Sequence, residues 1–402
     1  MHDGDGRYVV VSADCHAGAT LDTYRAYLEA RHLDEFEAWR RGRDASGAQD
    51  DRRNFDGAVR QADLEGDGIV AEVLFPNTVS PFHPGTPLLG ARDVADAREL
   101  ELRWAGIRAH NRWLADFCRE LPGRRAGVAE ILLEDVEAAV AEIRWAKEAG
   151  LQGGILLPNP NADSKVPQLH APLYEPIWAA CEELGLPVHV HGGGGGPNLG
   201  PYPSTPMMMF LEFSWYAQRP LVRLIFSGVL ERHPRLTLVF TETGNAWVPQ
   251  ALRELDWYHG RVARAKAGSI EAIFGGSVKQ LSLKPSEYWA RQCYLGASFL
   301  SARDCATRHR TGVERVMWGA DYPHREGTHP YTRQAYRLTF AGVERREIAL
   351  MLGLNAVRAY GFDLALLERA AARLGPTFAE VAEPLDASAL PDEAVSMALR
   401  TD

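Results

Sequence analysis

The sequence contains little that would mark a membrane-bound, secreted or nucleic-acid-binding protein. No apolar run approaches the roughly 20 residues that a membrane-spanning helix needs, and the first ten residues lack the basic and apolar segments of a signal peptide. Asp and Glu (53) outnumber Lys and Arg (44), and the formal net charge of −9 leaves no basic surplus to neutralise phosphates. We therefore expect neither a membrane nor a nucleic acid as a partner.

Cysteine is also scarce, with five residues in 402. The cysteines are scattered, they are odd in number, and no two have the spacing of a zinc ribbon. We therefore expect free thiols rather than a disulfide framework, which is typical of a protein of the reducing cytoplasm. Hydrophobic residues make up 46% of the chain, which is enough for a large core and excludes global disorder.

What the sequence does contain is an alternation of short apolar runs and amphipathic stretches. Apolar runs buried on both faces are typical of parallel strands, and several intervening stretches, such as 135–148 and 172–184, have helical periodicity. About eight repeats favour an α/β fold of the closed (β/α)8 TIM barrel type over an open sheet. The expected strands are 7–16, 71–75, 125–131, 153–157, 187–191, 236–241, 293–299 and 316–321.

Some segments exceed a minimal barrel. The mostly polar segment 17–68 follows the first expected strand, and the segment 197–220, rich in methionine and aromatic residues, follows the fifth. Long segments at the carboxyl ends of strands usually shape the mouth of an active site. We therefore expect one barrel domain over residues 1–363 that includes both insertions, followed by a C-terminal helical tail over residues 364–402.

Potential metal ligands gather at the ends of three expected strands. Asp14 and His16 end the first strand, His189 and His191 end the fifth, and Asp321 ends the eighth. Residues two apart on a strand share a face, and catalytic groups of a TIM barrel come from the carboxyl ends of its strands. Imidazole and carboxylate ligands together suit Zn²⁺, Mn²⁺ or Fe²⁺, so the pattern predicts one bound divalent cation.

Five segments carry a resemblance to a known family. They are VVVSADCHAG (9–18), PVHVHGG (187–193), FSGVLERHPRLTLVFTETG (226–244), VMWGADYPHREG (316–327) and LGLNAVRAYGFD (352–363). The chain resembles the amidohydrolase superfamily, in the amidohydrolase-2 branch that includes aminocarboxymuconate semialdehyde decarboxylase and gamma-resorcylate decarboxylase. The resemblance implies that Asp14, His16, His191 and Asp321 bind the metal, with zinc or manganese expected first and iron as an alternative. His189 stays open as a metal or substrate contact.

Three residues are expected to move protons. Glu242 ends the sixth strand at a position where many members of the branch carry a His, so we interpret it as an acid or base. His324, three residues after Asp321, is expected either to contact the substrate or to orient Asp321. Asp321 itself can accept a proton while it touches the metal.

Two reactions of a small organic substrate fit this set of residues. One is hydrolysis of an amide, ester or lactone bond, and the other is non-oxidative decarboxylation of an aromatic or unsaturated acid. We rank hydrolysis first because a second carboxylate near the metal, Glu242, would repel a substrate carboxylate unless Glu242 is protonated in a site of low dielectric constant. A metal-free ligand-binding barrel is the third alternative, and a homodimer or larger homo-oligomer is expected. The residues expected to line the substrate pocket are Phe210, Trp215, Tyr216, Arg219 and Arg325.

Overall fold

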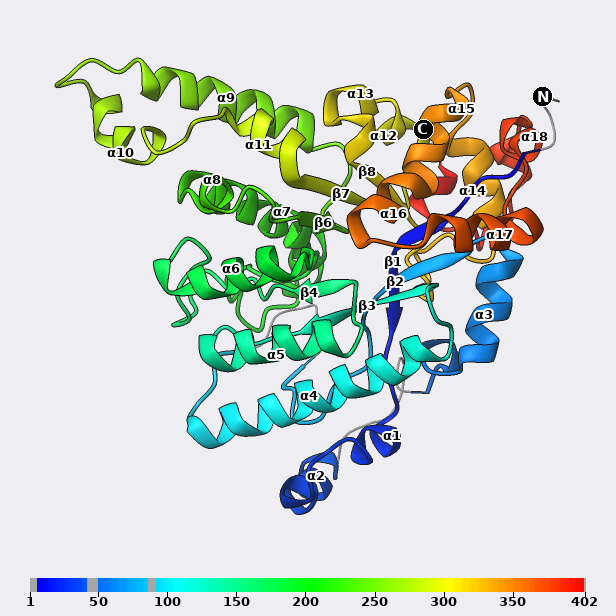
Figure 1. Cartoon of the computed structure of the whole chain (residues 1–402), viewed down its shortest axis with the longest axis horizontal. Coiled ribbons are helices and arrows are strands. Elements are labelled where there is room, and N and C mark those ends of the chain that lie inside the picture. Colours follow the sequence, from blue (N-terminus) through cyan, green and yellow to red (C-terminus); the bar gives the residue numbers. More distant parts are fainter. Residues whose placement is uncertain (1–5, 42–49, 86–91, 401–402) are drawn as a thin grey trace.

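The computed structural model describes residues 6–41, 50–85 and 92–400. Residues 42–49 of the first predicted insertion lie outside the described residues, as do residues 1–5 at the amino end. Eight parallel strands follow one another in sequence order and alternate with helices (Figure 1). They are β1 (Val11–Ala17), β2 (Ala71–Pro76), β3 (Arg125–Glu130), β4 (Gly154–Leu156), β5 (Val188–His191), β6 (Leu238–Thr241), β7 (Cys293–Ser298) and β8 (Val316–Gly319).

The sheet curls until its last strand meets its first. Ladders join each strand to the next from β1 to β8. The segment just after β8 then pairs with β1, because Asp321 N donates to Asp14 O (2.8 Å) and His16 N donates to Tyr322 O (2.7 Å). The predicted (β/α)8 TIM barrel is therefore confirmed, with strand ends that differ from the expected ones by a few residues.

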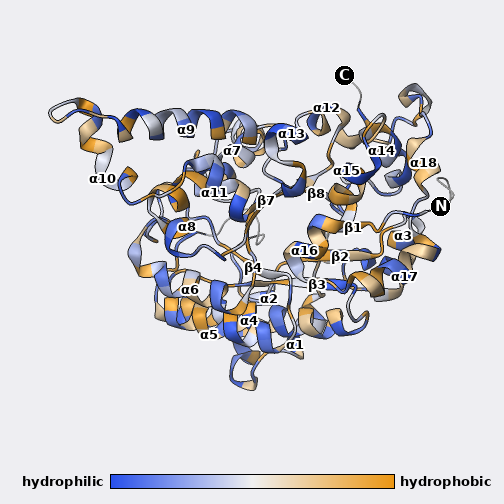
Figure 2. Ribbon diagram, turned by 45° about the horizontal axis from the view of Figure 1, so that its top comes forward, coloured by the Kyte–Doolittle hydropathy of each residue, from blue (hydrophilic) through white to orange (hydrophobic). Residues whose placement is uncertain are grey.

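Helices cover the outside of this barrel and present one hydrophobic face to it (Figure 2). The helix α4 (Ala97–Arg119) begins at Asp96, whose carboxylate accepts from Glu99 N at 2.9 Å. The helix α5 (Val136–Glu148) begins in the same way at Asp135. Such caps satisfy backbone N–H groups that have no partner within the helix. Further helices are α6 (Glu175–Leu184), α7 (Thr205–Phe226), α9 (Val248–Ala263) and α17 (Leu364–Leu374).

The two predicted insertions differ in the structure. The described part of 17–68 contains the short helices α1 (Leu21–Arg25), α2 (Leu33–Arg40) and α3 (Gly57–Gly66). The segment 197–220 was expected to be a long loop, but most of it belongs to α7, which continues past Pro220 to Phe226. Its methionine and aromatic side chains therefore lie on a helix, which fixes which of them face inward.

The tail and one helical arm complete the molecule. The tail folds back on the barrel, where Arg333 pairs with Glu380 and Leu399 joins a small core. The arm consists of α9 and α10 (Gly275–Val278) and projects from the body (Figure 1), with exposed apolar side chains that include Ile273. No helix among the described residues is long and apolar enough to cross a membrane. All five cysteines are buried free thiols.

Candidate metal centre

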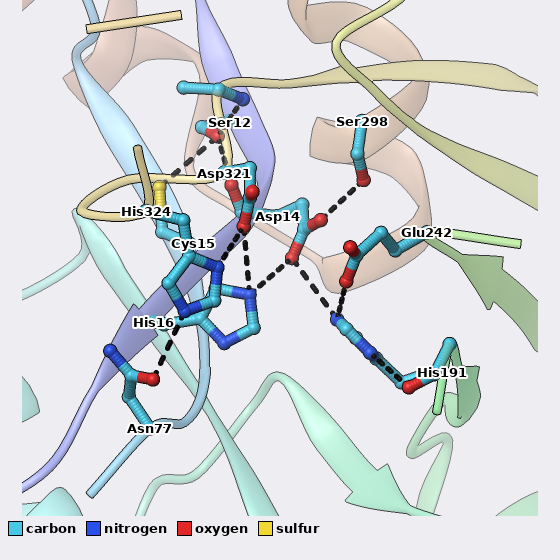
Figure 3. A network of polar contacts seen from close by, with 12 residues as sticks. Ser12, Asp14, Cys15, His16, Asn77, His191, Glu242, Ser298, Asp321 and His324 are labelled. Carbon is cyan, nitrogen blue, oxygen red and sulfur yellow. Dashed lines mark hydrogen bonds and ion pairs between the residues drawn. The ribbon is translucent and has the colours of Figure 1, made fainter. Parts of the chain in front are cut away.

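The first strand delivers two of the predicted ligands into the barrel. Asp14 and His16 lie on β1 and are fully buried, with 0% exposure. Their side chains share one side of the strand and point toward His191 of β5 (Figure 3). Gly319 of β8 leaves the space that Asp14 occupies, because a Cβ on Gly319 would lie 2.7 Å from the Asp14 Cβ.

Both histidines are held in the tautomer that a metal needs. The Nδ1 of His16 faces the carbonyl oxygen of Pro76 at 3.4 Å, and the Nδ1 of His191 faces the carbonyl oxygen of Gly192 at 3.0 Å. A carbonyl oxygen only accepts, so in each ring Nδ1 carries the hydrogen when the ring is neutral. The Nε2 of each ring is then left with a lone pair that points into the cluster.

Among the described residues, four buried atoms of the predicted ligands have no hydrogen-bond partner: Asp14 Oδ1, His16 Nε2, His191 Nε2 and Asp321 Oδ2. Ligand atoms of Asp14, His16, His191 and Glu242 lie within 4.8 Å of one another, and those of His16, Asp321 and His324 do so as well. Buried polar atoms without partners are costly in a folded protein, so such a cluster calls for a missing group. Asp14 Oδ1 lies 3.3 Å from His16 Nε2 and 3.5 Å from His191 Nε2, which leaves room for a shared ion. The residues present therefore fit a divalent cation.

The electrostatics of the cluster point the same way. Burial opposes a charge on His16, but its contacts with Asp14 and Asp321 raise the pKa of its imidazole well above the ordinary value. Burial likewise opposes a charge on Asp14, yet His16 and His191 hold the pKa of its carboxyl group below its usual range. Both pKa shifts indicate that the carboxylates of Asp14 and Asp321 favour positive charge in the cluster. A divalent cation meets the same demand and competes with protons for it.

Two carboxyl groups enter the cluster from strained backbone just past the ends of their strands. Glu242 follows β6 with φ +52°, and Asp321 lies two residues after β8 with φ +57°. Left-handed backbone is unfavourable for residues other than glycine and concentrates at functional sites. Carboxylate oxygens of Glu242, Asp321 and the exposed Glu326 lie within 4.8 Å of one another.

A hydrogen-bonded chain that begins at His324 holds Asp321, whose Oδ1 also lies 3.0 Å from His16 Nε2. His324 Nδ1 lies 2.8 Å from Asp321 Oδ1, and His324 Nε2 lies 3.0 Å from Asn77 Oδ1 (Figure 3). The amide of Asn77 donates in turn to Asn54 Oδ1 at 2.6 Å, which leaves its own oxygen to accept from His324. The structure thus places His324 beside Asp321, as expected for a residue that orients it.

Glu242 lies in a different environment from the other acids. Its Oε2 is 3.4 Å from His191 Nε2, and its side chain is 14% exposed at the wall of a cavity. Burial and the neighbouring carboxylates of Asp321 and Asp14 raise the pKa of Glu242 well above its ordinary value. A raised pKa favours the protonated form of Glu242, in which the group can donate a proton.

His189 is kept apart from the cluster. Its Nε2 bonds the carbonyl oxygen of Gly153 at 2.8 Å, and its ring stacks on Tyr360 with the ring centroids 5.6 Å apart. Burial lowers the pKa of His189 to about 3, so the ring is neutral. The structure brings His191, and not His189, up to Asp14 and His16.

A cavity of about 550 Å³, here called the main cavity, opens on the cluster. Phe210 and Tyr216 line it as expected, whereas Trp215, Arg219 and Arg325 lie outside its lining. Arg219 instead packs over the Tyr216 ring at 5.6 Å, and helix α7 turns Trp215 outward to 59% exposure. The full lining consists of Asn77, Asn161, Gly192, Gly193, Gly196, Pro197, Leu199, Pro206, Met209, Phe210, Glu212, Phe213, Tyr216, Glu242, His324 and Glu326.

Two residues near the cluster were not singled out in the sequence. Arg60 on α3 is fully buried, donates from NH1 to the His16 carbonyl oxygen at 2.7 Å, and pairs with Glu72 of β2 at 2.6 Å. Ser298 at the end of β7 donates from Oγ to Asp14 Oδ2. A signal for Arg60 did exist, since it is four residues before Leu64 and so lies on the apolar face of a helix.

Comparison with known proteins agrees with this geometry. A family model described as Amidohydrolase matches residues 13–362 of the chain. The chain belongs to the amidohydrolase family. The earlier resemblance is therefore confirmed, and the chain is an enzyme of the amidohydrolase superfamily.

The relatives of this amidohydrolase include decarboxylases. A gamma-resorcylate decarboxylase of Rhizobium sp. (strain MTP-10005) is 27% identical over 178 residues, which are 38% of this chain and 54% of the relative. The match thus spans about half the length of that relative. A 5-carboxyvanillate decarboxylase structure from Sphingomonas paucimobilis has a TM-score of 0.63 at 22% identity, and covers 88% of this chain and 99% of its own.

A second structure shows the same fold. It is a 5-carboxyvanillate decarboxylase from Novosphingobium aromaticivorans DSM 12444, complexed with manganese and 4-hydroxy-3-methoxy-5-nitrobenzoic acid. Its TM-score is 0.64 at 21% identity, and the match covers 90% of this chain and 99% of its own. At these identities the likeness to the two structures establishes the barrel and no more.

These findings correct one expectation. Hydrolysis was ranked ahead of decarboxylation, and that ranking is wrong, because the relatives found by sequence are decarboxylases. The ranking rested on repulsion between Glu242 and a substrate carboxylate, which holds only while Glu242 is ionised. Burial and the neighbouring carboxylates raise the pKa of Glu242, which favours its neutral form and weakens that repulsion.

Proposed function

We propose that this enzyme is a metal-dependent, non-oxidative decarboxylase of a hydroxybenzoate. The observation that carries the proposal is the place of Glu242, whose pKa is raised well above its ordinary value, at the wall of a largely apolar cavity that opens on the metal cluster. A decarboxylase needs a proton donor beside a ring-sized pocket, because a proton must replace the departing carboxylate on carbon. The decarboxylase relative, whose substrate class the proposal shares, supports it.

The ligands proposed for the metal are Asp14, His16, His191 and Asp321. Two carboxylates balance the charge of a divalent cation, and we propose manganese because oxygen ligands suit it and a structural neighbour holds it. Zinc is the alternative that metal analysis would reveal. When bound, such a cation polarises the carboxylate and phenolate oxygens of the substrate.

The chain's own residues then account for the proton. The ring of the substrate lies against the apolar wall that includes Phe210 and Tyr216 on α7. Glu242 gives its proton to the ring carbon that bears the carboxylate, the bond from that carbon to the carboxyl carbon breaks, and CO2 leaves. The electron pair of the broken bond returns to the aromatic ring, and Glu242 regains a proton from solvent through the open cavity.

The test follows the carbon and the proton together. The manganese-loaded enzyme is incubated in D2O with 2,6-dihydroxybenzoate, 5-carboxyvanillate and salicylate, while CO2 and the mass of the phenol are measured. We expect CO2 from at least one acid, with one deuterium in the product at the former carboxyl position. The matched control is His191→Ala, which removes one ligand atom from the cluster and is expected to release no CO2 above background.

Two outcomes would overturn the proposal. One is the absence of CO2 release from every acid by an enzyme that holds its metal in full. The other is CO2 release that proceeds unchanged after the metal has been removed with a chelator.

A further inference from the structure

A second, smaller cavity lies beside the main cavity and is here called the side pocket. It has a volume of about 110 Å³ and lies at the carboxyl ends of β3 and β4. Asn161 lines both cavities, and the His191 metal ligand and Gly194 line the side pocket, while Gly192 and Gly193 line the main cavity. The side pocket therefore lies next to the metal cluster, with His191 between them. A space of this size can take one edge of an aromatic ring and its substituent.

Glu130, the last residue of β3, lines the side pocket and is held firmly in place. Its backbone N–H donates to Asn111 Oδ1 at 2.9 Å, and its carbonyl oxygen accepts from Asn111 Nδ2 at 3.0 Å. Its side chain is 7% exposed. These two hydrogen bonds fix the backbone from which the Glu130 side chain extends, as suits a residue that recognises a ligand.

The carboxyl group of Glu130 has no hydrogen-bond partner among the described residues. Its Oε1 is buried and unpartnered, and it lies 3.8 Å from His110 Nε2. His110 itself is neutral, because burial lowers its pKa to about 3. Burial raises the pKa of Glu130 to about 8, so near neutral pH the group is mostly the neutral acid, which can donate and accept one hydrogen bond each.

The other groups around the side pocket narrow the ligand chemistry. Arg103 is buried and engaged, with its Nε 3.1 Å from Glu99 Oε1 and its NH1 2.8 Å from the Arg92 carbonyl oxygen. Asp93 and Glu134 add further acid to the lining, and Leu156 is among its apolar residues. A second carboxylate or a phosphate on the ligand would be disfavoured, because it would lie beside the acidic side chains and because Arg103 is already paired. A neutral hydroxyl group on a ring fits better, because it can pair with the Glu130 carboxyl group in both directions.

We propose that the side pocket binds a phenolic hydroxyl group of the substrate remote from the metal, and that Glu130 is the specificity-determining residue that hydrogen-bonds it. The inference rests on the proposed function, because it takes the aromatic acid of that reaction as the ligand. Within the hydroxybenzoates of that reaction, it assigns recognition of a second hydroxyl group to Glu130. Unsubstituted rings would leave the buried Glu130 carboxyl group without a partner.

Binding of ring compounds that lack a carboxylate tests the inference without any turnover. The probes are phenol, catechol, resorcinol and hydroquinone, and their affinities for the manganese-loaded enzyme are measured by calorimetry. We expect at least one dihydroxybenzene to bind roughly tenfold more tightly than phenol, the size of one well-made buried hydrogen bond. Glu130→Gln keeps a donor and an acceptor and should keep that preference. Glu130→Leu removes both and should bring the preference to within about twofold.

The outcomes separate this inference from the proposed function. Phenol affinity is the control for folding, and it should be alike in the wild type, Glu130→Gln and Glu130→Leu. A wild type that prefers no dihydroxybenzene, or a Glu130→Leu variant that keeps the full preference, overturns the role of Glu130 even if CO2 is released from hydroxybenzoates. If no acid releases CO2 and yet the preference depends on Glu130, the proposed reaction fails and the binding site stands.

Discussion

The two sides of the metal centre differ in how their side chains are held. On the side of β1 and β8, Asp14 accepts from a serine hydroxyl, His16 contacts a backbone carbonyl, and Asp321 is paired with His324. These three residues are fully buried, and backbone hydrogen bonds join the two segments that carry them. This side is a rigid wall whose geometry does not depend on a substrate.

On the side of β5 and β6 the constraints are fewer. His191 contacts the carbonyl of the next residue and precedes the glycine run 192–196, and Glu242 has an ion-pair contact with His191 but faces a cavity. Glycines occur here because the backbone packs closely on its neighbours: a Cβ on Gly195 would lie 2.2 Å from Asn159 Nδ2. The difference indicates a division of labour, in which one side positions the cation and the other meets the substrate.

The largest effect is expected from breaking the rigid side. His16→Ala removes a proposed ligand nitrogen. Loss of a residue that only hydrogen-bonds a metal ligand can lower metal affinity or activity by up to roughly 100-fold. We expect His16→Ala to lower both metal affinity and the rate of decarboxylation by well over that factor. Metal content after dialysis and the rate of CO2 release measure the two effects. The fold should persist, because the residues that stabilise such barrels lie mainly at the end opposite the active site.

The matched control is another buried histidine of the same barrel. His189→Gln keeps a group that can donate to the Gly153 carbonyl, and His189 lies outside the metal cluster. This variant should keep its metal and most of its activity. Loss of metal from His189→Gln, or full metal in His16→Ala, would contradict the ligand assignment.

The rigid side is also the side that the sequence reveals best. The pair Asp14 and His16 stands out because a strand places residues two apart on one face, and Asp321 stands out because it follows an apolar run. Local periodicity was sufficient for the eight strands as well. These features depend on a few neighbouring residues, which a sequence displays directly.

What the sequence did not reveal depends on burial created by distant segments. The raised pKa of Glu242 follows from its burial and from the carboxylates of Asp321 and Asp14, which lie far from it along the chain. The sequence left open whether Glu242 is ionised, and the reactions were ranked for the ionised form. The length of α7 was missed because the methionine-rich segment and Pro220 resemble a loop by composition. Which of its side chains face the cavity was set by that helix, as Trp215 and Phe210 illustrate.

A second prediction concerns the open side. Glu242→Gln preserves shape and removes the proton, so we expect kcat to fall by about 10²-fold while metal content stays near that of the wild type. The wild-type rate needs the protonated acid, so it should be present below the raised pKa of Glu242 and fall as pH rises through it. Glu242→Gln should lack that decline. An unchanged kcat, or a decline at high pH that survives in the variant, would remove Glu242 from the reaction.

The smallest effect on activity is expected behind the rigid side, at Arg60. Its guanidinium donates to the His16 carbonyl, pairs with Glu72 and lies over the Tyr322 ring at 4.8 Å, so it ties β1 and β2 to the segment after β8. Arg60→Met should leave Glu72 largely uncompensated and lower the free energy of unfolding by about 3–5 kcal/mol, as breaking a buried ion pair does. Metal affinity should fall by roughly tenfold, because a displaced His16 binds less well. Denaturant unfolding and metal titration measure these two quantities.

The double variant Arg60→Met, Glu72→Leu separates stability from positioning. Replacing both charges with apolar groups should restore much of the stability, since no unpaired carboxylate is left in the core. The restoration should be incomplete, because the Arg125 guanidinium loses its contact with Glu72. It does not restore the hydrogen bond to the His16 carbonyl, so the metal affinity should stay about tenfold below that of the wild type. If metal affinity recovers together with stability, Arg60 serves the fold alone, and the rigidity of this side arises from the hydrogen bonds that join β1 to the segment after β8.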